Sequence, residues 1–126
     1  VIPALIRKFH EASEKVVACW GDGTPLREFM YVDDLADACL IAMRSNIENA
    51  EHLNVGSGEE VSIRSLAEMV SEITNFNGEI IWDKGKPNGT PKRCLNYSRI
   101  LDLGWEPKYK LKNGLKKLYE WFKENF

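Results

Sequence analysis

Two kinds of apolar spacing alternate along this chain of 126 residues, and the alternation restricts the folds open to it. An apolar residue at every third or fourth position predicts amphipathic helices at 2–13, 33–45, 62–74, 98–103 and from about 112 onward. Short apolar runs predict strands at 16–20, 28–32, 52–55 and 79–82. Helices that alternate with strands are typical of an α/β domain. No linker rich in proline, glycine or serine divides the chain, so we expect one unit over residues 1–126.

The composition, with 44% apolar and 29% charged residues, is that of an ordinary globular protein, which argues against disorder. No apolar run approaches the roughly 18 to 20 residues that span a bilayer, so no membrane segment is expected. The three cysteines, Cys19, Cys39 and Cys94, lack a Cys-x-x-Cys spacing, which argues against zinc and favours a reducing, cytoplasmic setting. The sequence opens at Val1 in a helical pattern without a capping residue, so we expect it to be part of a longer protein.

Positive charge is concentrated in residues 84–117, which carry ten lysines and arginines against two acidic residues, although the whole chain has a net charge of −2. Such a segment suits nucleic acid or a smaller anionic ligand. Within it, the loop at 84–93 has two glycines that permit close backbone approach, and Lys92 and Arg93 could neutralise a diphosphate. A solvated charged loop is the alternative, and the local sequence alone favours it.

The stretch from Trp20 to Asp34 contains side chains that each have two interpretations. The indole of Trp20 is either part of the core or its rim, or a platform for a purine base. Arg27 follows a turn with two glycines and a proline, and it either binds a phosphate or pairs with Glu28 or a nearby aspartate. Asp33 or Asp34 is expected to cap the helix that follows.

No catalytic residue is predicted in the chain. The two histidines, His10 and His52, stand alone on a helix and at a strand start, where packing or surface roles are commoner than catalysis. Gly56-Ser57-Gly58 lacks the third glycine of a dinucleotide fingerprint and the lysine of a Walker loop. We interpret it as a strand exit that needs a positive φ. No metalloprotease, hydrolase or paired-cysteine signature occurs.

Five segments, in this order, resemble the GDP-L-fucose synthase family, whose members are extended short-chain dehydrogenases that act on nucleotide sugars. The segments are VIPALIRKFHEA, WGDGTPLREFMYVDDLADA, LNVGSGEEVSIRSLAEMV, KPNGTPKRCLNYSRILDLGW and LYEWFKEN, and the resemblance covers essentially the whole chain. The REF-x-Y-V-D-D and NVGSG elements are shared by many sugar-nucleotide epimerases and dehydratases. The first segment together with KP-x-GTP-K-R narrows the resemblance to the GDP-L-fucose synthases.

The resemblance implies that the chain is the carboxy-terminal, substrate-binding part of an extended Rossmann-type dehydrogenase. In the family, the amino-terminal part carries the glycine-rich NADP loop, the serine and Tyr-x-x-x-Lys reduction residues and an epimerising cysteine, and none of these is expected here. A second epimerising group, a histidine, would lie directly before Val1. The whole enzyme would epimerise GDP-4-keto-6-deoxy-mannose at C3 and C5 and reduce it at C4 with NADPH, commonly as a dimer. The isolated chain is expected to be inactive.

The resemblance also assigns substrate-binding roles to particular residues of this chain. A tryptophan at the position of Trp20 lies by the guanine, and an arginine at the position of Arg27 meets the diphosphate. Arg93, or Lys92 beside it, matches a further basic contact of the nucleotide sugar.

Two more positions that the resemblance marks as substrate-binding depart from the family pattern. Lys8 stands where the family usually has arginine, which keeps the charge but loses the two-pronged guanidinium. Asn88 replaces a usual aspartate, so its amide can hydrogen-bond a hydroxyl but brings no charge. Both departures bear on which sugar nucleotide is bound.

Two alternatives stay open. The chain could be part of another nucleotide-sugar epimerase or dehydratase, or a stand-alone nucleotide-binding module in which the basic segment at 84–117 contacts nucleotide or nucleic acid. We expect a GDP-sugar as the ligand, and neither nucleic acid nor a membrane as a partner.

Overall fold

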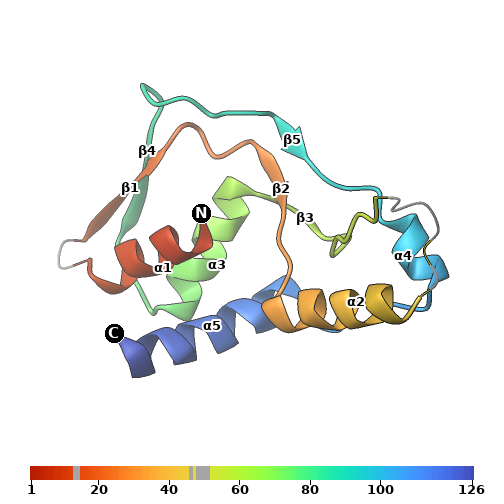
Figure 1. Cartoon of the computed structure of the whole chain (residues 1–126). Helices are drawn as coiled ribbons and strands as arrows, with labels where there is room; N and C mark the ends of the chain where they lie inside the picture. Colours follow the sequence, from red (N-terminus) through yellow and green to blue (C-terminus); the bar gives the residue numbers. More distant parts are fainter. Residues whose placement is uncertain (13–14, 46, 48–51) are drawn as a thin grey trace.

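The computed structural model describes residues 1–12, 15–45, 47 and 52–126. Helices and strands alternate along the chain, which confirms the predicted α/β class (Figure 1). In chain order the elements are α1 (Ile2–His10), β1 (Val16–Trp20), β2 (Leu26–Glu28), α2 (Val32–Arg44), β3 (Glu60–Ser62), α3 (Ile63–Ile73), β4 (Glu79–Asp83), β5 (Lys92–Arg93), α4 (Ser98–Asp102) and α5 (Leu111–Asn125).

Two small sheets organise the chain. β1 and β4 pair in parallel, with Val17 opposite Ile80. The other sheet has the order β3-β2-β5, in which β2 is antiparallel to β3 and parallel to β5. Parallel neighbours need a long connection, so β5 comes from a part of the chain far from β2. Arg27 consequently lies between Val61 and Arg93 in the middle of this sheet.

The main core forms where α3 packs against both α1 and α5, beside β1 (Figure 1). Leu66 of α3 and Ile6 of α1 are 0% and 2% exposed. Burial of such a side chain stabilises a fold by about 1.5–3 kcal/mol. The buried members of this cluster are Leu5, Ile6, Phe9, Val17, Cys19, Val61, Leu66, Ala67, Val70, Leu111, Leu115 and Tyr119. A smaller cluster of Ala38, Ile100 and Trp105 joins α2 to the region of α4.

The two central helices begin in different ways. Ser62 caps α3, because its Oγ accepts a hydrogen bond from the backbone N–H of Ser65 at 3.0 Å. At α2 the N-cap is Tyr31, which makes no side-chain capping bond, and Asp33 and Asp34 lie inside the first turn. The prediction that one of these aspartates caps the helix is therefore wrong. Both still place negative charge at the positive end of the helix dipole.

Several predicted segments differ from the structure. The run at 28–32 is divided, since β2 ends at Glu28 and α2 begins at Val32. The run at 52–55 forms no strand, because none of the described strands pairs with it. β5 arises inside a segment whose glycines and prolines predict only a loop, where β2 offers it a free edge. α1 ends at His10, and the predicted end at residue 13 lies outside the described residues.

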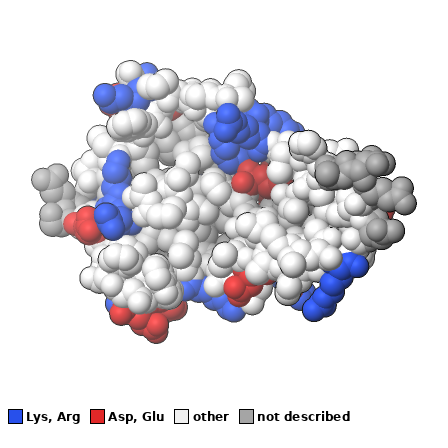
Figure 2. Space-filling model, viewed as in Figure 1, with Lys and Arg blue, Asp and Glu red and all other residues white. Residues whose placement is uncertain are grey.

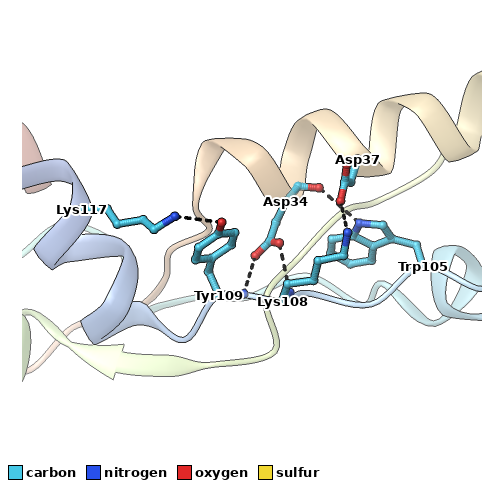
Figure 3. Close-up of polar contacts among 6 residues, drawn as sticks. All are labelled: Asp34, Asp37, Trp105, Lys108, Tyr109 and Lys117. Atoms are coloured by element: carbon cyan, nitrogen blue, oxygen red, sulfur yellow. Dashed lines mark hydrogen bonds and ion pairs between the residues drawn. The ribbon is translucent and has the colours of Figure 1, made fainter. Parts of the chain in front are cut away.

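Asp34 ties α2 to the segment that precedes α5 (Figure 3). It is 1% exposed, and its carboxylate accepts hydrogen bonds from the backbone N–H groups of Lys108 at 3.0 Å and Tyr109 at 3.1 Å. Its carbonyl oxygen accepts another from the indole N–H of Trp105 at 3.2 Å. A buried carboxylate is tolerated only when it is hydrogen-bonded in this way. Asp34 is therefore a structural residue.

Replacement of Asp34 by alanine should lower the free energy of unfolding by about 3 kcal/mol, because two backbone N–H groups lose a charged partner. Urea unfolding followed by tryptophan fluorescence measures the change. Asp33→Ala is the matched control: Asp33 is exposed in the same helical turn and offers only its charge near the helix dipole, about 0.3–1 kcal/mol. Equal losses for the two variants would contradict the structural role of Asp34.

Candidate functional site

A cavity of about 430 Å³ opens between α1, the end of β1 and the loop that follows β4. Four of the six predicted substrate-binding residues line it, namely Lys8, Trp20, Arg27 and Asn88. The rest of the wall is mainly apolar and consists of Val1, Ala4, Leu5, Cys19, Gly23, Pro25, Ile63 and Pro87. A volume of roughly 300–1,000 Å³ and an apolar wall with a few polar groups are typical of small-molecule sites.

Trp20 and Arg27 precede and follow the turn between β1 and β2. Trp20 is 66% exposed, so it is not a core residue, and Nζ of Lys86 lies 5.5 Å from the centre of its ring. Arg27 donates from Nη1 to the carbonyl oxygen of Leu26 at 2.7 Å. In the described part of the chain, Arg27 forms no ion pair with Glu28 or with an aspartate. An aromatic face and a guanidinium are thus available at the same cavity.

Lys8 adds a second positive charge to this cavity, and its Nζ donates to the carbonyl oxygen of Ala18 at 2.6 Å. Cys19 also lines the wall but is only 3% exposed. Burial raises the pKa of the Cys19 thiol, and the Lys8 ammonium partly offsets this rise. A buried thiol with a raised pKa is a poor nucleophile, so Cys19 is a wall residue.

The other two predicted residues, Lys92 and Arg93, form β5 and lie outside this cavity. Nζ of Lys92 pairs with the Glu60 carboxylate at 2.7 Å, and this hydrogen-bonded pair raises the pKa of Lys92 and lowers that of Glu60. Arg93 lies opposite Arg27 in the β2–β5 ladder and lines a neighbouring cavity of about 560 Å³. Figure 2 shows basic side chains gathered over β2 and β5. Two like charges on adjacent strands repel each other, and an anion between them would relieve that repulsion.

Asn88 already has a partner within the protein. Its Oδ1 accepts a hydrogen bond from the backbone N–H of Asp22 at 2.8 Å, which joins the loop after β4 to the turn after β1. From the other side, Nη2 of Arg64 donates to the carbonyl oxygen of Asp22 at 2.6 Å. Neither Asp22 nor Arg64 is among the site residues predicted from the sequence. The Asp-Gly-Thr turn is a signal for Asp22, whereas no local pattern marks Arg64.

The family that the sequence resembles uses NADP, but the described glycine loop that most resembles a dinucleotide loop does not suit a phosphate. The nearest candidate loop is Gly56-Ser57-Gly58, and its Gly58 N–H donates to the Glu28 carboxylate at 2.7 Å. The other oxygen of Glu28 accepts a bond from the Leu95 N–H at 3.0 Å. A carboxylate on the loop repels a phosphate. Gly58 has a φ of 71°, so the predicted positive φ is confirmed, but the prediction that the segment is a strand exit is wrong, because 52–55 forms no strand.

A Tyr-x-x-x-Lys spacing does occur in α5, at Tyr119 and Lys123, contrary to the expectation that the chain lacks one. Tyr119 is 8% exposed and its hydroxyl lies 3.0 Å from Nδ1 of His10, on α1. Lys123 pairs with Glu120 at 2.8 Å. Tyr119 does not line the cavity. The contact between His10 and Tyr119 therefore joins α1 to α5, and the Lys123–Glu120 pair lies within α5. This agrees with the packing or surface role predicted for His10.

The described part of the chain offers neither a metal site nor a membrane-spanning helix. No group of three or more histidine, cysteine, aspartate or glutamate side chains there could hold a metal ion. None of the described helices has both the length and the apolar character needed to cross a membrane.

Known proteins resemble this chain in sequence and in fold. The model of the NAD dependent epimerase/dehydratase family matches residues 1–56. Putative GDP-L-fucose synthase 2 of Arabidopsis thaliana is 52% identical over 99% of this chain and 39% of its own length. The GDP-mannoheptose C4 reductase of Campylobacter jejuni with NADP bound is 37% identical, with a TM-score of 0.86 over 97% of this chain and 44% of that one. The GDP-L-fucose synthetase of Naegleria fowleri bound to NADP is 27% identical, with a TM-score of 0.89 over 99% of this chain and 40% of that one.

The α/β fold and these matches define the class: the chain is homologous to the extended, Rossmann-type dehydrogenases and epimerases of the NAD dependent epimerase/dehydratase family. Within that class it is homologous to a part of the GDP-L-fucose synthases, and the resemblance stated from the sequence is confirmed. The chain spans 39% of the length of its Arabidopsis relative, so the activity of a whole protein must be inferred.

Cys19 should react far more slowly with a thiol reagent than Cys39, because Cys19 is buried with a raised pKa and Cys39 is exposed on α2. Two single-thiol chains test this, one with Cys39→Ser and Cys94→Ser, the other with Cys19→Ser and Cys94→Ser. Absorbance with dithionitrobenzoate at pH 8 should show fast reaction at Cys39 and, at Cys19, a rate set by unfolding. Equal rates would contradict the conclusion that Cys19 is a poor nucleophile.

Proposed function

We propose that residues 1–126 form the carboxy-terminal, sugar-nucleotide-binding part of an enzyme of the GDP-L-fucose synthase type. The proposed substrate is GDP-4-keto-6-deoxy-mannose, which the whole enzyme epimerises at C3 and C5 and reduces at C4 with NADPH. Two findings support this proposal: the similarity to GDP-L-fucose synthases over 99% of the chain, and a cavity that joins an exposed indole to positive charges.

The cavity is the main structural support for the proposal, because it offers the two kinds of contact that a GDP-sugar needs. The exposed face of Trp20 suits a flat base, and base–aromatic stacking contributes roughly 1–3 kcal/mol per base. Arg27 and Lys8 supply positive charge, and a guanidinium can form two parallel hydrogen bonds with a phosphate. Arg93, opposite Arg27 on β5, extends the positive surface. The combination suits a base followed by a diphosphate.

The proposed role of this chain is to bind and orient the substrate, while the reacting groups belong to the remainder of the enzyme. NADPH, bound there, would supply the hydride. Correct orientation matters because a misplaced carbonyl loses most of the advantage of proximity. The isolated chain then has no reductase activity, and oxidation of NADPH by the purified 126-residue chain would contradict this assignment. We further propose a cytoplasmic homodimer as the whole enzyme, with neither nucleic acid nor a membrane as a partner.

A different GDP-sugar is the second candidate, since the similar Campylobacter protein is a GDP-mannoheptose C4 reductase. Lys8 and Asn88, the two positions that depart from the pattern expected of the GDP-L-fucose synthases, both line the cavity. The two candidates share the GDP group, so GDP itself is the right probe for the site.

Arg27→Ala should weaken the binding of GDP to the chain about 10- to 100-fold, because a hydrogen bond to a charged group contributes roughly 1.5–3 kcal/mol. Isothermal titration calorimetry measures Kd. Arg44→Ala is the control, because Arg44 is exposed on α2 and does not line the cavity. Failure of the unaltered chain to bind GDP, or an unchanged Kd for Arg27→Ala, would count against the proposed function.

The same titration distinguishes the contributions of Lys92 and Arg93, the two residues of β5, to GDP binding. Lys92 is held by Glu60, so Lys92→Ala should change Kd less than Arg93→Ala does. A larger loss for Lys92→Ala would reassign the basic contact from Arg93 to Lys92.

A further inference from the structure

The turn between β1 and β2 is held by side chains from two distant segments. Asn88 accepts the N–H of Asp22 at 2.8 Å, and Arg64 donates to the carbonyl oxygen of Asp22 at 2.6 Å. Within the turn, Oδ1 of Asp22 accepts hydrogen bonds from the N–H of Thr24 at 2.9 Å and from its hydroxyl at 2.7 Å. Both backbone polar groups of Asp22 and its carboxylate are therefore engaged.

The two glycines of the turn show how closely these partners approach. Gly21 has a φ of 77°, and a Cβ there would lie 2.2 Å from Oδ1 of Asn88. Gly23 has a φ of 78°, and a Cβ there would lie 2.7 Å from the ring of Trp82 and 2.9 Å from Cβ of Arg64. Only glycine satisfies both the positive φ and these contacts. The turn is thus shaped around Asn88 on one side and Arg64 on the other.

The chemistry of Asn88 is specific to an amide. Its carbonyl oxygen accepts the Asp22 N–H at 2.8 Å. Hydrogen bonds from Thr24, and then the neighbouring Asn88 side chain, lower the pKa of Asp22 to about 2, so Asp22 carries a negative charge beside Asn88. An aspartate at position 88 would keep the acceptor, but it would set two carboxylates against each other.

The contact lies where it can control the cavity. Trp20 comes directly before the turn and Arg27 two residues after it, and both line the cavity. Pro87 and Asn88 line the same cavity from the loop after β4. Lys86, two residues before Asn88, lies over the Trp20 ring. One hydrogen-bonded contact thus joins the segment that carries the indole to the segment that carries the lysine.

We propose that Asn88 is a positioning residue for the ligand of this cavity. By its contact with Asp22 it ties the loop after β4 to the turn after β1, and so holds Trp20 and Arg27 in the arrangement that binds a nucleoside diphosphate. This inference rests on the proposed function, but it assigns Asn88 a role through the turn and not through a bond to a sugar hydroxyl.

The test compares three variants, Asn88→Ala, Asn88→Asp, and the exchange Asp22→Asn with Asn88→Asp. The exchange keeps these bonds without placing two carboxylates together: the new carboxylate at position 88 accepts the backbone N–H of residue 22, and the new amide at position 22 still accepts from Thr24. Both single variants should weaken GDP binding roughly 5- to 10-fold, since one hydrogen bond contributes about 1 kcal/mol. The exchange should restore Kd to within about twofold, as expected for directly coupled residues.

Two measurements accompany the GDP titration. Hydrogen exchange of the amide at position 22, followed by NMR, should be slow in the unaltered chain and in the exchange variant and fast in Asn88→Ala, which removes the acceptor. This measurement needs no ligand and shows whether the contact exists. Urea unfolding checks that the variants stay folded, so that a loss of affinity is not a loss of structure.

The outcomes separate this inference from the proposed function. Weak binding by both single variants and recovery in the exchange variant support positioning. If the exchange variant stays weak while its amide at position 22 is protected, Asn88 contacts the ligand directly and the inference is overturned. If Asn88→Ala binds GDP as the unaltered chain does while Arg27→Ala does not, only this inference fails. If the unaltered chain binds no GDP, the proposed function fails and the positioning role with it.

Discussion

The pairing of β2 on both of its edges is the constraint on which the site depends. This three-residue strand is bonded to β3 on one side and to β5 on the other, so it joins the start of α3 to the loop after β4. Glu28 at its end adds bonds to the N–H groups of Gly58 and Leu95. A strand with partners on both edges cannot change register without losing both ladders. Arg27, in its centre, is therefore set at a defined place on the cavity wall.

Charge is used for two separate purposes in this molecule. The carboxylates of Glu28 and Asp34 accept hydrogen bonds from backbone N–H groups and so connect segments far apart in the sequence. The cavity carries the cations Lys8 and Arg27, and none of the described residues on its wall is acidic. A chain with a net charge of −2 can consequently present a positive site. The exposed ion pair of Lys92 and Glu60 adds little stability, but it makes the lysine less available to a ligand.

Binding and chemistry are divided in the proposed enzyme. The described residues form a cavity suited to a base and a diphosphate, whereas the loop that might have held a dinucleotide phosphate is occupied by Glu28. Binding energy from the nucleotide end of a substrate can orient its reacting end. A site that binds only the nucleotide can therefore increase the rate of the reaction, although the catalytic groups lie in another part of the proposed enzyme. This requires that Trp20 and Arg27 are held rigidly.

The sequence by itself determined the α/β class, the extents of β1 and α4 and the approximate extent of α5, because each depends on local periodicity. The resemblance to the GDP-L-fucose synthase family also marked Trp20 and Arg27 as substrate-binding residues. The local sequence alone left each of them with two possible roles. Only the tertiary structure decided that 52–55 forms no strand, that Asp34 bonds to the segment before α5, and that Asn88 meets Asp22. These facts depend on groups brought together from distant parts of the chain, and local spacing carries no information about such partners.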